Sequence, residues 1–352
     1  MADINTQFEK EHLRQLQALQ KRIALAYGET IVNVFKAATG LQARRDTFRI
    51  TDYPALETIL ERELLKLQAG IEGMVVNGIQ SQWELSLQKF GALIDQRYRG
   101  KAIPTPLKQA IFNPNKGAMD AFLKRKTNGL TLSDRVWNNV KQFRGELEQG
   151  LYLGISEGKP AAKMATEMKQ YLKEPDKLFR RVRDAEGNLQ LSKAAQEYKP
   201  GQGVYRSSYK NALRVARTET NMAYRAADHE RWKKTDFILG FEVKLSNSHP
   251  RPDICDSLKG VYPKEFKFTS WHPNCLCFAV PILPTAEQYN EYEKALLRGE
   301  EKGFKFEDVV REPHEGFRSY YESQKQTIEG YQSTPYWVKD NPKYTKAKSP
   351  SN

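Results

Sequence analysis

The chain has 352 residues, of which 39% are hydrophobic and 28% are charged, and its formal net charge is +13. This length predicts two domains with connecting or terminal segments. No apolar stretch approaches the ~18 residues that cross a bilayer, so we expect no membrane partner. The first ten residues include Asp3 and Glu9 and no apolar segment follows them, which argues against a secretory signal.

The first hundred residues predict an antiparallel helical arm or bundle. Residues 6–38 carry apolar side chains at helical spacing and contain no proline, which indicates one long helix. A second helix is expected to begin at Pro54, and a third to follow Gly70 and run over 71–97. The pattern is interrupted over 100–118, where we place a domain boundary, by Pro104, Pro106, Pro114 and Gly117.

The middle of the chain carries nearly all of the excess positive charge. Residues 101–240 contain 27 Lys and Arg against 15 Asp and Glu. We expect helices from Ser133 and over 160–172, and a hairpin turn at 184–188 between two short strands. Charge concentrated in one segment can form a patch that meets a polyanion, and the alternative is a solvated basic surface.

Residues 205–234 predict a helix with distinct sides. One sector is apolar, Glu219 lies on one flank of it, and the other flank carries basic residues. We expect this basic edge to bind the phosphates of double-stranded DNA without reading its sequence. Its residues are Arg206, Lys210, Arg214, Arg217 and Arg225.

The fold class that these patterns predict is α+β and mainly helical. Short strands are expected at 238–245 and 278–283, on either side of a loop that holds every cysteine, and a helix at 286–297. The predicted domains are a helical arm over 1–118 for assembly contacts, a small α+β module over 119–285, and a partly disordered extension over 286–352.

Three cysteines and one histidine in this loop form a candidate zinc site. Cys255, His272, Cys275 and Cys277 supply four nitrogen and sulfur ligands, the number that structural Zn²⁺ requires. The Cys-x-Cys spacing is uncommon, and His249 or Asp253 is an alternative fourth ligand. Buried free thiols are the main rival interpretation, and a disulfide is a third.

Most enzyme classes lack their motifs in this sequence. The spacing of the cysteines differs from that of zinc deaminases, and neither a Walker A, a G-x-S-x-G nor a G-x-G-x-x-G motif occurs. A metal-dependent nuclease remains the alternative enzymatic hypothesis. Its site would contain Glu219, His249, Asp253 and His272.

Several motifs in one order resemble the phage Mu F-like head morphogenesis domain. Ala216-Arg217-Thr218-Glu219-Thr220 and Trp232 are followed by Asp253-x-Cys255-x-x-Leu258-x-Gly260 and then by His272-Pro273-Asn274-Cys275-Leu276-Cys277. The resemblance covers about residues 160–285. This chain has Pro252 where family members often carry a further cysteine, and Leu276 where they often carry an arginine.

The resemblance implies a minor head protein without catalytic activity. Such a protein is built into the prohead, next to the portal or the major capsid protein on the capsid interior, after synthesis in the host cytoplasm. In some relatives it also meets packaged DNA, which agrees with the basic middle segment. A nuclease and a free DNA-binding regulator are the two competing hypotheses.

Overall fold

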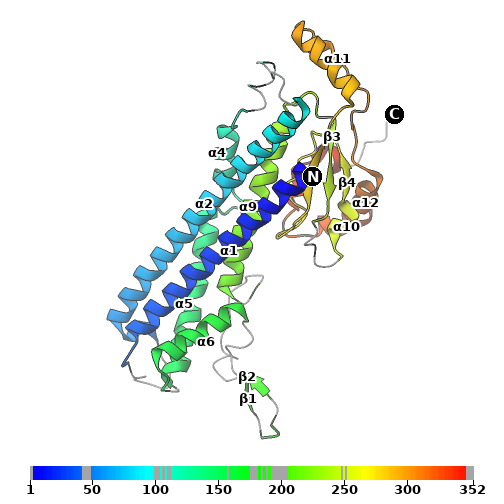
Figure 1. Cartoon of the computed structure of the whole chain (residues 1–352). Coiled ribbons are helices and arrows are strands. Elements are labelled where there is room, and N and C mark those ends of the chain that lie inside the picture. The colour runs from blue at the N-terminus through cyan, green and yellow to red at the C-terminus, as the bar shows by residue number, and fades with distance from the viewer. Residues whose placement is uncertain are drawn as a thin grey trace. The chain divides into compact units, whose positions relative to one another are not determined.

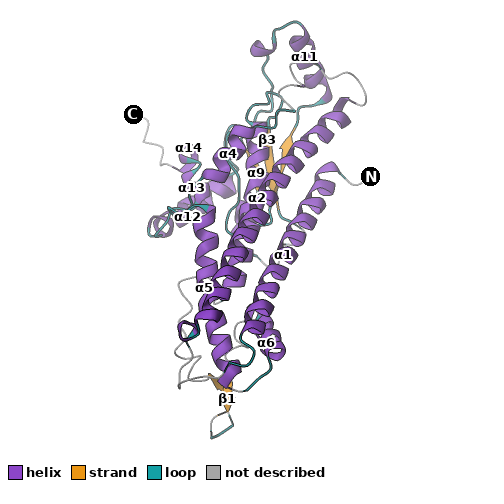
Figure 2. Cartoon of the chain, turned by 90° about the vertical axis from the view of Figure 1, so that its left-hand side faces the viewer, coloured by secondary structure: helices purple, strands orange, loops and turns teal. Residues whose placement is uncertain are grey.

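The computed structural model is mainly helical with a small antiparallel sheet, as the sequence predicts (Figures 1 and 2). It describes residues 3–41, 49–98, 112–156, 158–174, 181–183, 185–187, 189–191, 207–246 and 252–345, together with 104, 108, 205 and 249. Most of the expected boundary at 100–118 lies outside these residues, and so does the end of the chain after 345.

The two longest helices form the N-terminal third. Helix α1 spans Ile4–Ala37, and α2 spans Pro54–Tyr98 after a short 3-10 helix at Ile50–Asp52. The expected break at Gly70 is wrong, because α2 runs through it without interruption. Leu67 and Ile71 are buried on either side, and their packing outweighs the ~1 kcal/mol by which glycine disfavours a helix.

The chain divides into two compact units that do not follow the predicted domains. Unit 1 contains 1–16, 78–124 and 218–352, and unit 2 contains 17–77 and 125–217. The expected boundaries at 118 and 285 are therefore corrected. Sequence-local patterns could not reveal this division, because α1, α2 and α9 (Ser208–Trp232) each contribute residues to both units.

Unit 2 is a helical bundle that adds α5 (Leu132–Ser156) and α6 (Ala161–Lys173) to parts of α1, α2 and α9. At its centre the Tyr27 ring packs against Phe143 and Tyr209, with ring centroids 4.7 and 5.5 Å apart. Thr131 and Asp134 exchange hydrogen bonds at the start of α5. The hairpin expected near 184–188 is confirmed by antiparallel strands β1 (Arg181–Arg183) and β2 (Leu189–Leu191).

Unit 1 contains a three-stranded antiparallel sheet in the order β4-β3-β5. Strand β3 spans Gly240–Lys244 and β5 spans Phe278–Ile282, which confirms both expected strands. Strand β4 (Gly260–Tyr262) was not foreseen from the sequence and follows the short helix α10 (Ile254–Leu258). In the sheet Phe241 lies opposite both Tyr262 and Pro281.

The segment after 285 belongs to the core of unit 1. Helix α11 (Ala286–Leu297) confirms the expectation, and α12 (Glu315–Glu329), α13 (Tyr336–Lys339) and α14 (Pro342–Thr345) follow a 3-10 helix at Glu301–Gly303. Phe317 and Trp337 are buried in the same cluster as Phe241 and Phe90. The predicted separate extension is thus wrong for 286–345, since its aromatic side chains complete this core.

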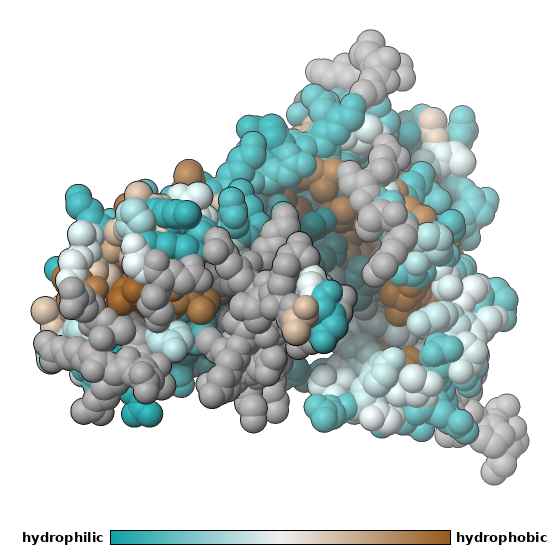
Figure 3. Space-filling view, turned by 90° about the horizontal axis from the view of Figure 1, so that it is seen from below, coloured by the Kyte–Doolittle hydropathy of each residue, from teal (hydrophilic) through white to brown (hydrophobic). Residues whose placement is uncertain are grey.

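The face in Figure 3 is mainly hydrophilic, with apolar side chains in separate patches. Within the described ranges, we find no helix with the length and apolar character of a membrane span. Helix α4 spans Lys116–Lys124 and buries Phe122, whose ring lies 6.1 Å from that of Trp83.

Candidate metal centre

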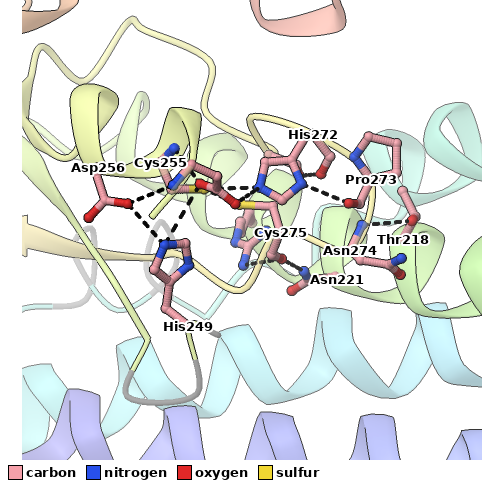
Figure 4. Close-up of polar contacts among 12 residues, drawn as sticks. Thr218, Asn221, His249, Cys255, Asp256, His272, Pro273, Asn274 and Cys275 are labelled. Carbon is pink, nitrogen blue, oxygen red and sulfur yellow. Dashed lines mark hydrogen bonds and ion pairs between the residues drawn. The ribbon is translucent and has the colours of Figure 1, made fainter. Parts of the chain in front are cut away.

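One face of α9 anchors the cysteine loop. Thr218, Asn221 and Arg225 recur at helical spacing, so their side chains lie along one side of the helix. The Thr218 hydroxyl accepts a hydrogen bond from the Asn274 backbone at 3.2 Å, and the side chains of Asn221 and Arg225 both donate to the Cys275 carbonyl (Figure 4). The guanidinium of Arg225 also donates to the Thr269 carbonyl at 3.1 Å.

The motif His272-Pro273-Asn274-Cys275 forms a tight turn on this face. Asn274 has a φ of 64°, in the left-handed region that asparagine tolerates better than most residues. The turn closes with a hydrogen bond of 3.1 Å from the Cys275 backbone to the His272 carbonyl. This conformation places the imidazole of His272 and the thiol of Cys275 on the same side, facing Cys255 (Figure 4).

Cys255 is held in place by the first turn of α10. Asp253 is the N-cap residue and its carboxylate accepts a hydrogen bond of 2.7 Å from the Cys255 backbone. The carboxylate of Asp256 in turn accepts a hydrogen bond from the Asp253 backbone. This capping box fixes a helix of only five residues. Two loop segments distant in sequence are thereby brought together at one point.

The donor atoms of three predicted ligands converge. Cys255 Sγ lies 3.1 Å from His272 Nε2 and 3.7 Å from Cys275 Sγ. Two thiolates on a tetrahedral zinc ion, each at ~2.3 Å, would be about 3.8 Å apart, so the sulfur spacing fits such an ion. All three cysteines are free thiols, and therefore the disulfide interpretation does not describe this structure.

Cys277, the fourth predicted ligand, is buried beside the other thiols but does not join this convergent group. A carboxylate oxygen of Asp253 lies 3.2 Å from His272 Nε2, and Asp253 forms a second group with His249 and Cys255. His249 in turn lies 3.1 Å from a carboxylate oxygen of Asp256. Asp253 is likewise outside the group of Cys255, His272 and Cys275, but of the alternatives weighed from the sequence its carboxylate is the one that approaches both Cys255 and His272.

The pKa values of the three cysteine thiols are shifted in different directions. Hydrogen bonds with the other two thiols raise the pKa of Cys255. Burial opposes ionisation of Cys275, yet hydrogen bonds from Cys255 and Cys277 and the charge of Arg225 hold its pKa well below the ordinary value. Metal ions bind the thiolate form of cysteine, so this environment favours Cys275 as a metal ligand.

Only part of the predicted basic edge of α9 is accessible to solvent. Lys210, Arg214 and Arg217 are half-exposed, whereas Arg225 is only 2% exposed. Including Arg225 in a DNA-binding surface was therefore wrong, because its guanidinium is committed to carbonyls of the cysteine loop. Arg206 lies outside the described residues.

The residues of the nuclease hypothesis are not all brought together. His249, Asp253 and His272 lie around Cys255, but Glu219 is 2% exposed on α9 and belongs to neither group of candidate ligands. Trp232, which the family resemblance singled out, is buried in the aromatic core of unit 1.

A buried polar network behind the site could not be foreseen from the sequence. The His12 imidazole joins Gln82 and Asn221, the residue that also binds the Cys275 carbonyl. Burial lowers the pKa of His12 to about 4, so the ring is neutral near pH 7. His12 and Asn221 are 209 positions apart, and no local pattern links them.

Comparison with known proteins identified no relative of this chain. No protein-family model matches the chain, and no match was found among curated proteins or solved structures.

Proposed function

We propose that the protein is a structural component of a phage head, a minor head protein of the capsid interior near the portal and the major capsid protein. The observation that carries the proposal is the meeting of the three family-like motifs at one site. Thr218 of the first motif binds the turn of the third, whose Cys275 faces Cys255 of the second. The motif order that suggested the family therefore corresponds to one local structure.

The chemistry of this site supports a structural role over a catalytic one. Thiolates and imidazole are the donors that structural zinc prefers. Cys255, His272 and Cys275 would hold the ion, with Asp253 as the fourth ligand. Bound zinc would supply a cross-link between α10 and the turn at 272–275. Loop segments with few large aliphatic side chains gain order from such a link.

Contact with packaged DNA is the second part of the proposal, and it rests on Lys210, Arg214 and Arg217. Each phosphate that a cation neutralises contributes about −0.9 to the slope of log affinity against log salt concentration. Reversing the charge of all three residues should weaken binding to duplex DNA and flatten that slope. Reversing three exposed cations outside the basic segment should leave the slope unchanged; Lys294, Arg298 and Lys302 serve as this control.

Quantitative mass spectrometry of purified phage particles tests the proposal as a whole. A minor head protein should copurify at a low, fixed ratio to the major capsid protein and persist through a density gradient. Its absence from particles would contradict the proposal. A parallel cleavage assay on duplex and single-stranded DNA with Mg²⁺ tests the nuclease alternative. Cleavage by the unaltered protein that is lost in Asp253→Asn would support a catalytic role in place of a structural one.

A further inference from the structure

A groove in unit 2 has no part in the proposed function. It has a volume of about 640 Å³ and is lined by α1, α6 and the first turn of α9. On α1 the lining residues Lys21, Leu25, Gly28 and Val32 recur at helical spacing, so one face of the helix forms one wall. Helices α1 and α6 lie close together in both views of the chain (Figures 1 and 2).

The wall of the groove is apolar and open to solvent. Leu25 is 67% exposed and Val32 is 40% exposed, although neighbouring positions on α1 bury their side chains in the bundle. Between them Gly28 has no side chain, and a Cβ there would lie 3.5 Å from Lys169 Cε, in ordinary contact. Because Gly28 has no side chain, the side chain of Lys169 can lie against α1 between the two exposed apolar residues.

Positive charge surrounds this apolar strip. Lys21, Lys169 and Lys173 are exposed at the groove, and its described lining includes one acidic residue, Glu29. Among the described residues none of the three lysines forms an ion pair with a carboxylate. An occupant that covers the strip therefore meets lysine side chains at its edges.

We infer that the groove binds an amphipathic helix of a partner protein, with leucine-type side chains on one face and glutamate or aspartate on its flanks. A helix presents such anchors at positions i, i+3 or i+4, and i+7. The strip from Leu25 to Val32 is about 10 Å long at ~1.5 Å per residue, which equals roughly two turns of a docked helix. Acidic flanks would pair with the lysines.

Two other occupants agree less well with these observations. A second copy docked through the same strip would bring six lysines together with only two glutamates, which like charges disfavour. A membrane surface also attracts lysines beside apolar residues, but it suits a convex helix face and not a strip recessed between two helices. Charge and shape together favour an acidic helix.

The test uses the full-length chain and two labelled peptides of 18 residues, measured by fluorescence anisotropy. Both peptides carry leucine at helical spacing; one has glutamate on its flanks and the other lysine at the same positions. The glutamate peptide should bind at least about tenfold more tightly. Leu25→Glu, at an exposed position, should abolish its binding, and Lys169→Glu with Lys173→Glu should weaken it at least about tenfold. The same change at exposed Leu297, on α11, is the matched control and should have no effect.

Equal binding of the two peptides would overturn the inference, as would binding that survives Leu25→Glu in a protein with an unchanged circular dichroism spectrum. Sedimentation velocity and flotation with vesicles of phosphatidylcholine and phosphatidylglycerol test the other occupants. Self-association or vesicle binding that Leu25→Glu abolishes, without binding of the glutamate peptide, would assign the groove to a second copy or to a membrane.

Discussion

Glu146 is a carboxyl group with no exposure to solvent, and it joins two helices of unit 2. It accepts hydrogen bonds from the Ser208 backbone and hydroxyl at 2.8 and 2.6 Å, at the first residue of α9. A side chain of α5 thus satisfies an amide at the start of another helix. Burial raises the pKa of Glu146 to about 8, although the hydrogen bonds from Ser208 lower it.

This pKa makes stability depend on pH. A carboxyl group whose pKa is raised in the folded state binds its proton more tightly there, so stability falls as pH rises from about 4.5 to about 8. His12 and His229, with pKa values lowered to about 4, act in the opposite direction below 6.5. Cys275, whose pKa lies well below its ordinary value, also acts in the opposite direction up to about pH 8.5. We therefore expect Glu146 itself to lower the free energy of unfolding between pH 6.5 and 8, by at most about 1.4 kcal/mol per pH unit.

Urea unfolding at several pH values measures this effect. Between pH 7 and 8, where burial of Glu9, with a pKa of about 7, contributes less, the slope of stability against pH should be less negative in Glu146→Gln than in the unaltered protein. The exposed residue Glu300 provides the control, since Glu300→Gln should leave the profile unchanged. An identical profile in Glu146→Gln and the unaltered protein would show that Glu146 ionises normally.

At the residue scale, the sequence identified candidate metal ligands that lie close together in the chain. His272 and Cys275 share one turn, and their spacing alone indicated a site. Arg225 was misassigned because a helical projection shows which face a residue occupies, but not what covers that face. The Cys275 carbonyl that binds Arg225 lies 50 residues away.

At the scale of elements, Gly260 begins β4 with a backbone that few other residues adopt. Its φ is 147°, and a Cβ at this position would lie 2.6 Å from the ring of His314. Gly260→Ala should therefore lower the free energy of unfolding by about 1 to 3 kcal/mol. Gly73→Ala, in the interior of α2 with no atom within 4 Å of the new Cβ, should leave stability unchanged or raise it by up to ~1 kcal/mol.

Urea denaturation of both variants checks this contrast. If Gly260→Ala proved as stable as Gly73→Ala, neither the backbone at 260 nor its close approach to His314 would constrain the fold.

Long elements were predictable because their periodicity is repeated many times. Helix α1 and strands β3 and β5 lie where the apolar pattern placed them. Strand β4 has three residues, too few for an alternating pattern, and it forms only because β3 lies beside it. The predicted break at Gly70 was wrong because tertiary packing outweighed the low helix preference of glycine.

At the scale of the whole molecule, the N-terminal helices are part of the core of unit 1. Phe90 and Ile94 of α2 are buried with Phe237 of the C-terminal module, and the Phe90 and Phe237 rings stack with centroids 6.4 Å apart. Lys89 of α2 forms a buried ion pair with Asp228 of α9. The sequence could not indicate these contacts, because they join segments more than 130 residues apart.

Removal of residues 1–100 should consequently unfold the remainder. It would expose the aromatic core and remove Lys89 and Ser86, the buried partners of the Asp228 carboxylate. Near-ultraviolet circular dichroism of the fragment 101–352 measures the loss of fixed aromatic packing. A soluble fragment with a native-like spectrum and cooperative unfolding would restore the separate arm that the sequence suggested.

The central claim is that a metal ion links α10 to the turn at 272–275, and elemental analysis of protein purified without chelator tests it most directly. We expect about one equivalent of zinc, a strong reduction in Cys275→Ser, and a lower melting temperature after chelation. Asp253→Asn and Cys277→Ser identify the fourth ligand, with the greater loss of zinc expected for Asp253→Asn. Less than about a tenth of an equivalent, together with stability that strong chelation does not change, would contradict the claim and leave three buried thiols.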